Sequence, residues 1–311
     1  MKPTDRILFA TILLLAIALM PALQSCFTGV EGTGKINLSK KDISVTAPTQ
    51  EEKFLSDISF PVAGEWRPGL PFFVSDDKLR LLVENPANVS LQAGDTLYFS
   101  DVQARMGADG GETSIFIFEK NGANIFYPVE KPLKDSRNSI TASDLAMLID
   151  LDMVERVTAK LLGRTLWTKS ALWYDDNMKY HKGSKFAKVT VVDVLPGNSF
   201  FPLMVAFRDD EGRNGRLLMN FGTSGNESRS FSRLFFLNDP RSNYKHVSDE
   251  NWSAIQAEQL RLGMTKEEVR LSRGNPSDVN TGHDYSNTLE IWYYPDGSFV
   301  RFIDGLVVNY K

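Results

Sequence analysis

One short segment near the C-terminus constrains the fold more than any other, because it specifies both ends of a helix. Thr265 and Glu268 have the spacing of a capping box, in which each side chain accepts a hydrogen bond from the backbone N–H of the other residue. Gly274 and Pro276 end the helix, since glycine closes the last turn and proline cannot continue it. The sequence therefore predicts a helix over residues 266–273.

The residues around this helix predict a small α+β module over residues 248–311. Ser248 begins an earlier helix, which ends before Gly263. Asp-Gly pairs at residues 296 and 304 each separate apolar runs, and Asp-Gly is the strongest short signal of a β-hairpin. The expected order is two helices followed by three strands. The strands are expected at residues 289–294, 299–303 and 306–310.

The middle of the chain predicts two β-rich modules joined by a helix. Short apolar runs over residues 61–140 are separated by Gly, Asn, Asp and Pro, which is typical of a small antiparallel sheet. Residues 141–162 are the expected connecting helix, because Thr141 can cap it and apolar residues recur at helical spacing. Residues 163–240 contain further strands in a number that suits an SH3-like barrel or meander. The strands are expected at residues 79–83, 96–100, 113–118 and 125–129, and then at 165–173, 187–195, 201–207, 217–221 and 231–237.

The two β-rich modules share a faint internal similarity. Residues 94–98, Gly-Asp-Thr-Leu-Tyr, resemble residues 163–167, Gly-Arg-Thr-Leu-Trp. The similarity favours two related barrels, although it covers only a few positions.

Residues 1–25 have the layout of a bacterial export signal. Basic residues precede an apolar run over residues 7–20, which is shorter than the about 20 residues that span a membrane. The following residues, Leu-Gln-Ser-Cys, resemble the lipobox of bacterial lipoproteins. That resemblance implies cleavage between Ser25 and Cys26 and an acyl anchor such as palmitate on Cys26. An ordinary signal peptide with an incidental cysteine is the alternative, and residues 26–60 are expected to be a flexible tether.

Composition and charge exclude several classes of function. The chain has 35 basic and 39 acidic residues and no basic tract, so a nucleic-acid partner is not expected. Cys26 is the single cysteine and the three histidines lie far apart, which predicts neither a disulfide framework nor a metal site. No arrangement of Ser, His and Asp suggests a hydrolase. We therefore expect no cofactor, no metal and no enzymatic activity.

The C-terminal residues combine a helix cap, a helix stop and a final hairpin in one order. These residues are Gly263, Met264, Thr265, Val269, Gly274 and Pro276, then Trp292 and Tyr293, and then Phe302, Asp304 and Gly305. The combination resembles the SmpA/OmlA, or BamE-like, domain of outer-membrane lipoproteins. In that family the domain is a non-catalytic accessory of the machinery that folds β-barrels into the outer membrane, and the same fold recurs in β-lactamase inhibitor proteins. The resemblance implies a two-layer ααβββ domain that binds protein partners. The sequence departs from the family pattern in one loop. The loop between the first two family strands is reduced here to residues 295–297.

The hairpin register predicts which residues of this domain bind a partner. If residues 296 and 297 form a two-residue loop, Tyr294 faces Phe299 and Trp292 faces Arg301. Trp292, Tyr294, Phe299 and Arg301 then lie on the open face, where Arg301 beside Trp292 could add a cation–π contact. The alternative is that the preceding module covers this patch. Leu289, Ile291, Tyr293, Val300 and Phe302 are expected under the helices, with Glu290 on the open face.

The expected function is that of a non-enzymatic outer-membrane lipoprotein that faces the periplasm. Its partners are the membrane, through the acyl anchor, and an envelope protein, through the BamE-like domain, in envelope or outer-membrane assembly. Two alternatives stay open: a module that binds cell-wall peptidoglycan through the SH3-like region, and an enzyme inhibitor of the β-lactamase-inhibitor fold.

Overall fold

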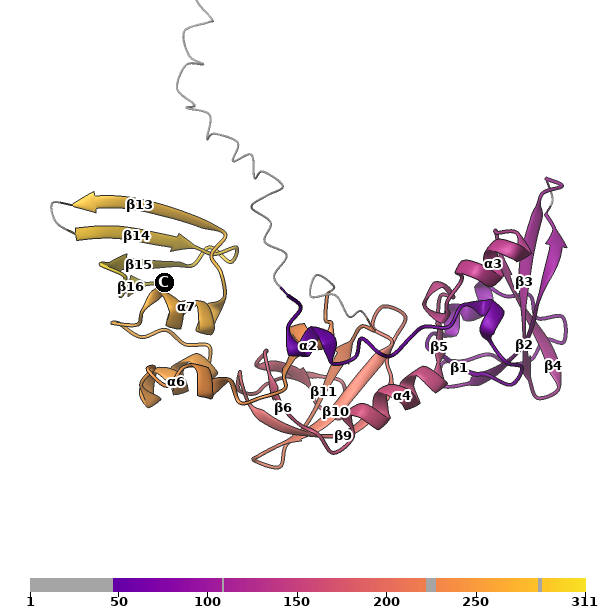
Figure 1. Cartoon of the computed structure of the whole chain (residues 1–311), viewed down its shortest axis with the longest axis horizontal. Coiled ribbons are helices and arrows are strands. Elements are labelled where there is room, and N and C mark those ends of the chain that lie inside the picture. The colour runs from indigo at the N-terminus through magenta and orange to yellow at the C-terminus, as the bar shows by residue number, and fades with distance from the viewer. Residues whose placement is uncertain (1–46, 108, 222–227, 285–286) are drawn as a thin grey trace, which may run out of the picture. The chain divides into compact units, whose positions relative to one another are not determined.

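The structure is a computed structural model, and it describes residues 47–311 with gaps at residues 108, 222–227 and 285–286 (Figure 1). The predicted export signal, Ser25, Cys26 and the first part of the predicted tether lie outside the described residues. The described chain is mixed α+β and rich in strands, as the sequence predicts, and its strands form three antiparallel sheets.

The first sheet has five strands in the order β4-β3-β2-β1-β5. Its core is aromatic: the ring of Trp66 lies 5.2 Å from Phe72, 5.2 Å from Phe99 and 5.6 Å from Phe116. These phenylalanines come from three neighbouring strands, so they bury one face of the sheet. The strands are β1 (Pro71–Val74), β2 (Thr96–Met106), β3 (Glu112–Lys120), β4 (Ala123–Val129) and β5 (Leu148–Asp150), and the short helices are η2 (Ala63–Glu65), η3 (Asp77–Leu81), α3 (Leu133–Ser139) and η4 (Ala142–Asp144).

The second sheet has seven strands in the order β12-β6-β9-β10-β11-β7-β8. The strands expected at residues 201–207 and 217–221 are present as a central hairpin, in which Leu203, Val205 and Phe207 are buried and their strand pairs with the next one. Helix α4 contributes Met153 and Val157 to the same core. The strands are β6 (Thr165–Thr168), β7 (Leu172–Tyr174), β8 (Tyr180–Lys182), β9 (Lys188–Pro196), β10 (Leu203–Asp209), β11 (Asn214–Met219) and β12 (Phe235–Phe236), and the helices are α4 (Leu151–Leu161), α5 (Phe231–Leu234) and η5 (Pro240–Asn243).

The first two sheets share one strand order. When the five shared strands of each sheet are numbered in chain order, their order across the sheet is fifth, first, second, third, fourth. In both sheets a short helix precedes the fifth strand. The second sheet adds the hairpin β7–β8, which pairs with β11. The similarity between residues 94–98 and 163–167 does not follow this correspondence, because Thr96 begins the second strand of its sheet and Thr165 begins the first. It therefore aligns strands that are not equivalent.

Two elements of the first module differ from the prediction. Residues 79–83 are not a strand, because Asp76 caps the short helix η3 by accepting a hydrogen bond from the backbone of Lys78. Residues 141–162 are not one helix. The capping box at Thr141 is present, but it begins η4, and α4 starts only after Asp150. Between them β5 pairs with β1, so the buried residues Leu148 and Ile149 belong to the sheet.

Residues 48–60, which we call the strap, pack against the second module. The strap contains helix α2 (Gln50–Lys53), and the ring of Phe54 lies 4.7 Å from Phe231. Leu55 and Ile58 belong to the hydrophobic core of the second sheet. The prediction of a flexible tether is therefore wrong for these residues, because their apolar side chains have a core to enter.

The C-terminal module has two layers, with helices α6 (Asp249–Gln256) and α7 (Lys266–Arg273) on one face of a four-stranded sheet (Figure 1). The predicted bounds of α7 are confirmed, and the capping box between Thr265 and Glu268 is present. The sheet has one strand more than predicted, so the order is ααββββ. The strands are β13 (Asp278–Asp284), β14 (Asn287–Tyr293), β15 (Phe299–Ile303) and β16 (Leu306–Tyr310).

Candidate functional site

The hairpin between β14 and β15 decides which side chains of the C-terminal sheet are exposed. Trp292 pairs with Val300 and not with Arg301, so the register is shifted by one residue from the predicted one. The turn is longer than two residues, because the backbone N–H of Gly297 donates to the carbonyl of Tyr294, inside the turn. A shift of one residue exchanges the two faces of a strand. The prediction that Trp292 and Tyr294 lie on the open face is therefore wrong, and both are buried.

Trp292 lies at the centre of the C-terminal core. Its ring is 4.8 Å from that of Phe302, and the guanidinium of Arg270 lies 4.7 Å above it. Its indole N–H donates to Glu290, which also accepts a hydrogen bond from Lys266. Burial alone would raise the pKa of Glu290, but the hydrogen bonds from Lys266 and Trp292 outweigh it and hold that pKa below its usual value. The predicted cation–π pair is thus replaced by one that uses a different arginine.

The opposite side of this sheet has an apolar patch over β14, β15 and the start of β16, which we call the outer face. Polar residues border it, since Asp278 and Asn280 of β13 and Asn309 of β16 lie on the same side. The members of the outer face pair across β14, β15 and β16 in rows that alternate with the buried rows. Tyr293 and Leu306 are exposed, and the other apolar members are partly exposed. Among the described residues, none of the outer-face side chains belongs to the hydrophobic core of the module. The outer face consists of Leu289, Ile291, Tyr293, Phe299, Arg301, Ile303 and Leu306.

Arg301 stands exposed in the middle of the outer face. It forms no ion pair with any residue that the structure describes. Other arginines of the module do have partners: Arg261 binds Glu250, and Arg273 binds Asp296. Of the four predicted partner-binding residues, Phe299 and Arg301 therefore keep an open position. The apolar residues beside them were expected in the core. The signal that could have corrected the register is Pro295, because a proline before the Asp-Gly pair favours a longer turn.

The preceding module contacts the C-terminal module on its helical side. Phe186, from the second β-rich module, stacks on Trp252 of α6 with ring centroids 5.3 Å apart. Tyr244 stacks on the same ring at 6.0 Å, and the guanidinium of Arg241 lies 5.0 Å from it. The side chain of Lys185 donates to the carbonyl of Ser272, near the end of α7. The alternative that the preceding module covers the predicted patch is therefore wrong, because this contact uses Trp252.

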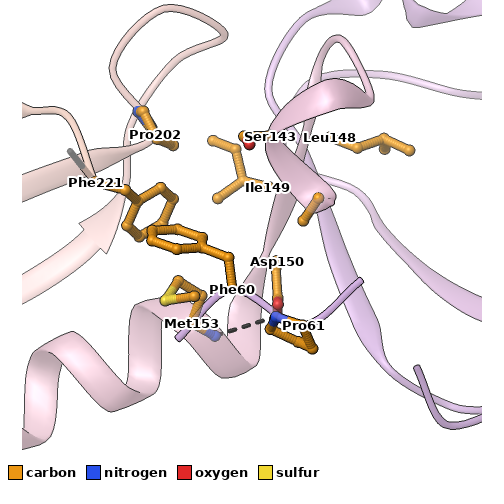
Figure 2. A pocket seen from close by; sticks show the side chains of 10 residues that line it. Phe60, Pro61, Ser143, Leu148, Ile149, Asp150, Met153, Pro202 and Phe221 are labelled. Atoms are coloured by element: carbon orange, nitrogen blue, oxygen red, sulfur yellow. Dashed lines mark hydrogen bonds between the residues drawn. The ribbon is translucent and has the colours of Figure 1, made fainter. Parts of the chain in front are cut away.

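Figure 2 shows a small pocket between segments of the first and second β-rich modules. The rings of Phe60 and Phe221 meet edge to face at 5.2 Å on one side, and Pro202 and Met153 lie beside them (Figure 2). The pocket has a volume of about 20 Å³, which is room for about one water molecule. The small volume and the mostly apolar lining of the pocket indicate a packing contact between segments and not a substrate site.

The one carboxyl group of this pocket has a structural role. Asp150 is only 2% exposed and caps helix α4, since its side chain accepts a hydrogen bond of 3.2 Å from the backbone of Met153 (Figure 2). Burial raises the pKa of Asp150, although that hydrogen bond opposes the shift. No second titratable side chain lines the pocket within the described chain, so it lacks the acid and base pair that catalysis of proton transfer needs.

The outer face is thus the candidate functional site, and its chemistry is that of a surface that binds another molecule. Within the described ranges, no three His, Cys, Asp or Glu side chains are grouped so as to hold a metal ion. No helix of the described residues combines the length and the apolar character that crossing a membrane requires. Comparisons of the chain with models of known protein families, with curated proteins and with solved structures find no match.

Proposed function

We propose that the chain is a non-enzymatic, lipid-anchored adaptor on the periplasmic side of a bacterial outer membrane. In this proposal Cys26 carries the acyl chains, the two β-rich modules are SH3-like, and the C-terminal module is a BamE-like domain that binds an envelope protein. The support for the anchor is the sequence pattern that ends at Cys26. The support for the SH3-like modules is their common order of five antiparallel strands, with a short helix before the last.

The outer face is the single observation that carries the binding function. A sheet covered by helices on one face normally has polar side chains on the other. Here six apolar side chains share a side of the sheet with one exposed arginine, which lies between Ile291 of β14 and Asn309 of β16, and contiguous exposed apolar surface marks sites of interaction. The arginine selects a partner that places a carboxylate within an apolar patch.

Site-specific photocross-linking tests this binding function. A photoreactive amino acid in place of Tyr293 should give one discrete cross-linked product in the envelope. Adding the substitution Arg301→Glu should remove that product, because it sets two negative charges against each other. The matched control is the same photoreactive group in place of Tyr98, an exposed tyrosine of the first sheet, which should give no such product. The same product from both positions, or a product indifferent to Arg301→Glu, contradicts the proposal.

A separate experiment tests the anchor. Cys26→Ser removes the thiol that would carry the acyl chains, so the protein should move from the membrane to the soluble fraction or remain unprocessed. The measurement is incorporation of labelled palmitate together with cell fractionation. Label that is still incorporated into the Cys26→Ser protein counts against the anchor, and it leaves the outer face untouched as a binding site.

A further inference from the structure

A second surface with the features of a binding site lies on the second sheet, on the side opposite its core. One row of cross-strand neighbours runs over five adjacent strands there. Because residues directly opposite each other in antiparallel strands share a face, the row is continuous. It spans about 10 Å from β11 to β8, which is two strand spacings. The row consists of Asp193, Ala206, Arg216, Tyr174 and Tyr180.

The row passes over a depression of about 220 Å³. A small residue, Ala206, lies in it and leaves space open. Beside it β9 contains a bulge, at which Val192 has no partner on β10 and is exposed. Bulges of this kind are frequent next to binding sites, because they re-aim the neighbouring side chains. The depression is therefore built by the sheet itself.

The polar side chains around the depression form a network with balanced charge. Arg216 binds the carboxylate of Asp176 at 3.1 Å, and the amide of Asn214 donates to the same carboxylate at 2.9 Å. Arg208 donates to Asn214 at 3.3 Å. Asp193 has no ion-pair partner in the described chain, and all of these residues line the depression. Two carboxylates and two guanidinium groups cancel, so the depression suits an uncharged ligand.

Two tyrosines extend the depression with a flat aromatic surface. The rings of Tyr174 and Tyr180 are stacked with centroids 4.4 Å apart, and their hydroxyl groups are joined by a hydrogen bond of 2.8 Å. Tyr180 is 68% exposed, so most of this ring is open to a ligand. The stack holds the outer ring in one orientation, and a ring fixed in this way can bind the apolar face of a ligand at little cost in entropy.

We infer that this surface binds an uncharged β-1,4-linked oligosaccharide. Such a chain is extended and flat, which matches a straight row on a sheet, and its C–H groups pack against an aromatic ring. Its hydroxyl groups both donate and accept, as the carboxylate, amide and guanidinium groups of the depression require. A peptide bound by strand addition is disfavoured over the depression itself, because the main-chain groups of β9, β10 and β11 already pair with one another, and the sheet has its edge at β8. The inference does not depend on the outer face of the C-terminal module.

Titration calorimetry of the full-length protein with chitotriose and cellotriose tests the inference. At least one of them should bind, and maltotriose, whose α-linked chain is curved, should bind more weakly. Tyr180→Ala should lower the affinity by about tenfold or more, whereas Tyr180→Phe, which keeps the ring, should retain it. Tyr98→Ala is the matched control, since it removes an exposed tyrosine of the first sheet and should change nothing.

Three results would overturn the inference. The first is no heat of binding from either β-linked probe at concentrations up to about 10 mM. The second is equal affinity of the wild type and Tyr180→Ala, with thermal unfolding showing that both are folded. The third is binding of a proline-rich peptide at Tyr180 together with no binding of the saccharides. Cross-linking from Tyr293 would be unaffected by any of these results, so the two sites can fail separately.

Discussion

Glu290 shows how one charged residue can stabilise a nearly apolar layer. Its carboxylate accepts hydrogen bonds from Lys266 and from the indole of Trp292, and these contacts keep its pKa below the usual glutamate value. A carboxyl group whose pKa is lower in the folded than in the unfolded protein stabilises the fold above its unfolded pKa. That contribution is lost as the pH falls through the folded value.

Glu290→Gln should therefore have an effect that depends on pH. At pH 7 we expect it to lower the free energy of unfolding by about 1 kcal/mol, because the charge-assisted hydrogen bonds are lost. The difference from the wild type should shrink as the pH falls below 4.5, since the wild-type carboxyl then becomes protonated as well. Urea denaturation at pH 7 and at about pH 3.5 measures it. Glu250→Gln is the control, and a gap that widens on acidification would contradict this account.

Trp292 and Tyr293 are neighbours in sequence with opposite environments. Trp292→Ala should lower the free energy of unfolding by about 3–5 kcal/mol, because it leaves a cavity against Phe302 and Arg270. Tyr293→Ala removes a ring that is 37% exposed and should cost about 1 kcal/mol or less. The ratio of these two effects, measured by urea denaturation, reports the register directly. A larger cost for Tyr293→Ala would mean that the register predicted from the sequence is correct.

At the scale of elements, the two Asp-Gly hairpins of the C-terminal sheet behave differently. Asp304 and Gly305 both have positive φ, 50° and 82°, and form the two-residue loop that the sequence predicts. In the other hairpin only Gly297 has positive φ, at 79°, because Pro295 begins a longer turn. The same dipeptide thus gives two registers, and the residue before it makes the difference.

Substitution of glycine tests the longer turn. Gly297→Ala should lower the free energy of unfolding by about 1 kcal/mol, because alanine is strained at positive φ although no atom lies within 4 Å of the added carbon. Gly282→Ala in β13 is the matched control: it also meets open space, but its φ is not positive. That variant should be neutral or slightly more stable. Equal effects of the two substitutions in thermal unfolding would disprove the strain.

The elements that could be predicted are those whose signals are local. The cap at Thr265 and the stop at Gly274 bound a helix within a few residues, so the bounds of α7 follow from the sequence. Strand β13 has mostly polar residues and owes its conformation to pairing with β14, a contact that no local pattern records. Trp292 was assigned to the wrong face for a related reason. Its side chain follows the register, which the turn at Pro295 sets from outside the strand.

At the scale of the whole molecule, Phe186 couples two modules. It belongs to the second β-rich module in sequence, yet its ring lies in the core of the C-terminal module against Trp252. Phe186→Ala should uncouple the two, because the stacked contact and its apolar area are lost. We expect calorimetry to show an additional, earlier unfolding transition. Phe200→Ala, at an 82% exposed position, is the control and should leave the profile unchanged. Identical profiles for both variants would show that the modules are joined by other contacts.

The strap has a mechanical consequence. A pulling force applied at the N-terminal end of the described chain reaches Phe54, Leu55 and Ile58 before it reaches any β-strand. These side chains are packed along the second module, and Asp57 of the strap binds Lys160 of α4. Tension would therefore act in shear on several contacts of the strap at once, before it began to separate the strands of a sheet. A force applied at the N-terminal end of the described chain would in this way be carried by the strap before it reached the strands of the sheets.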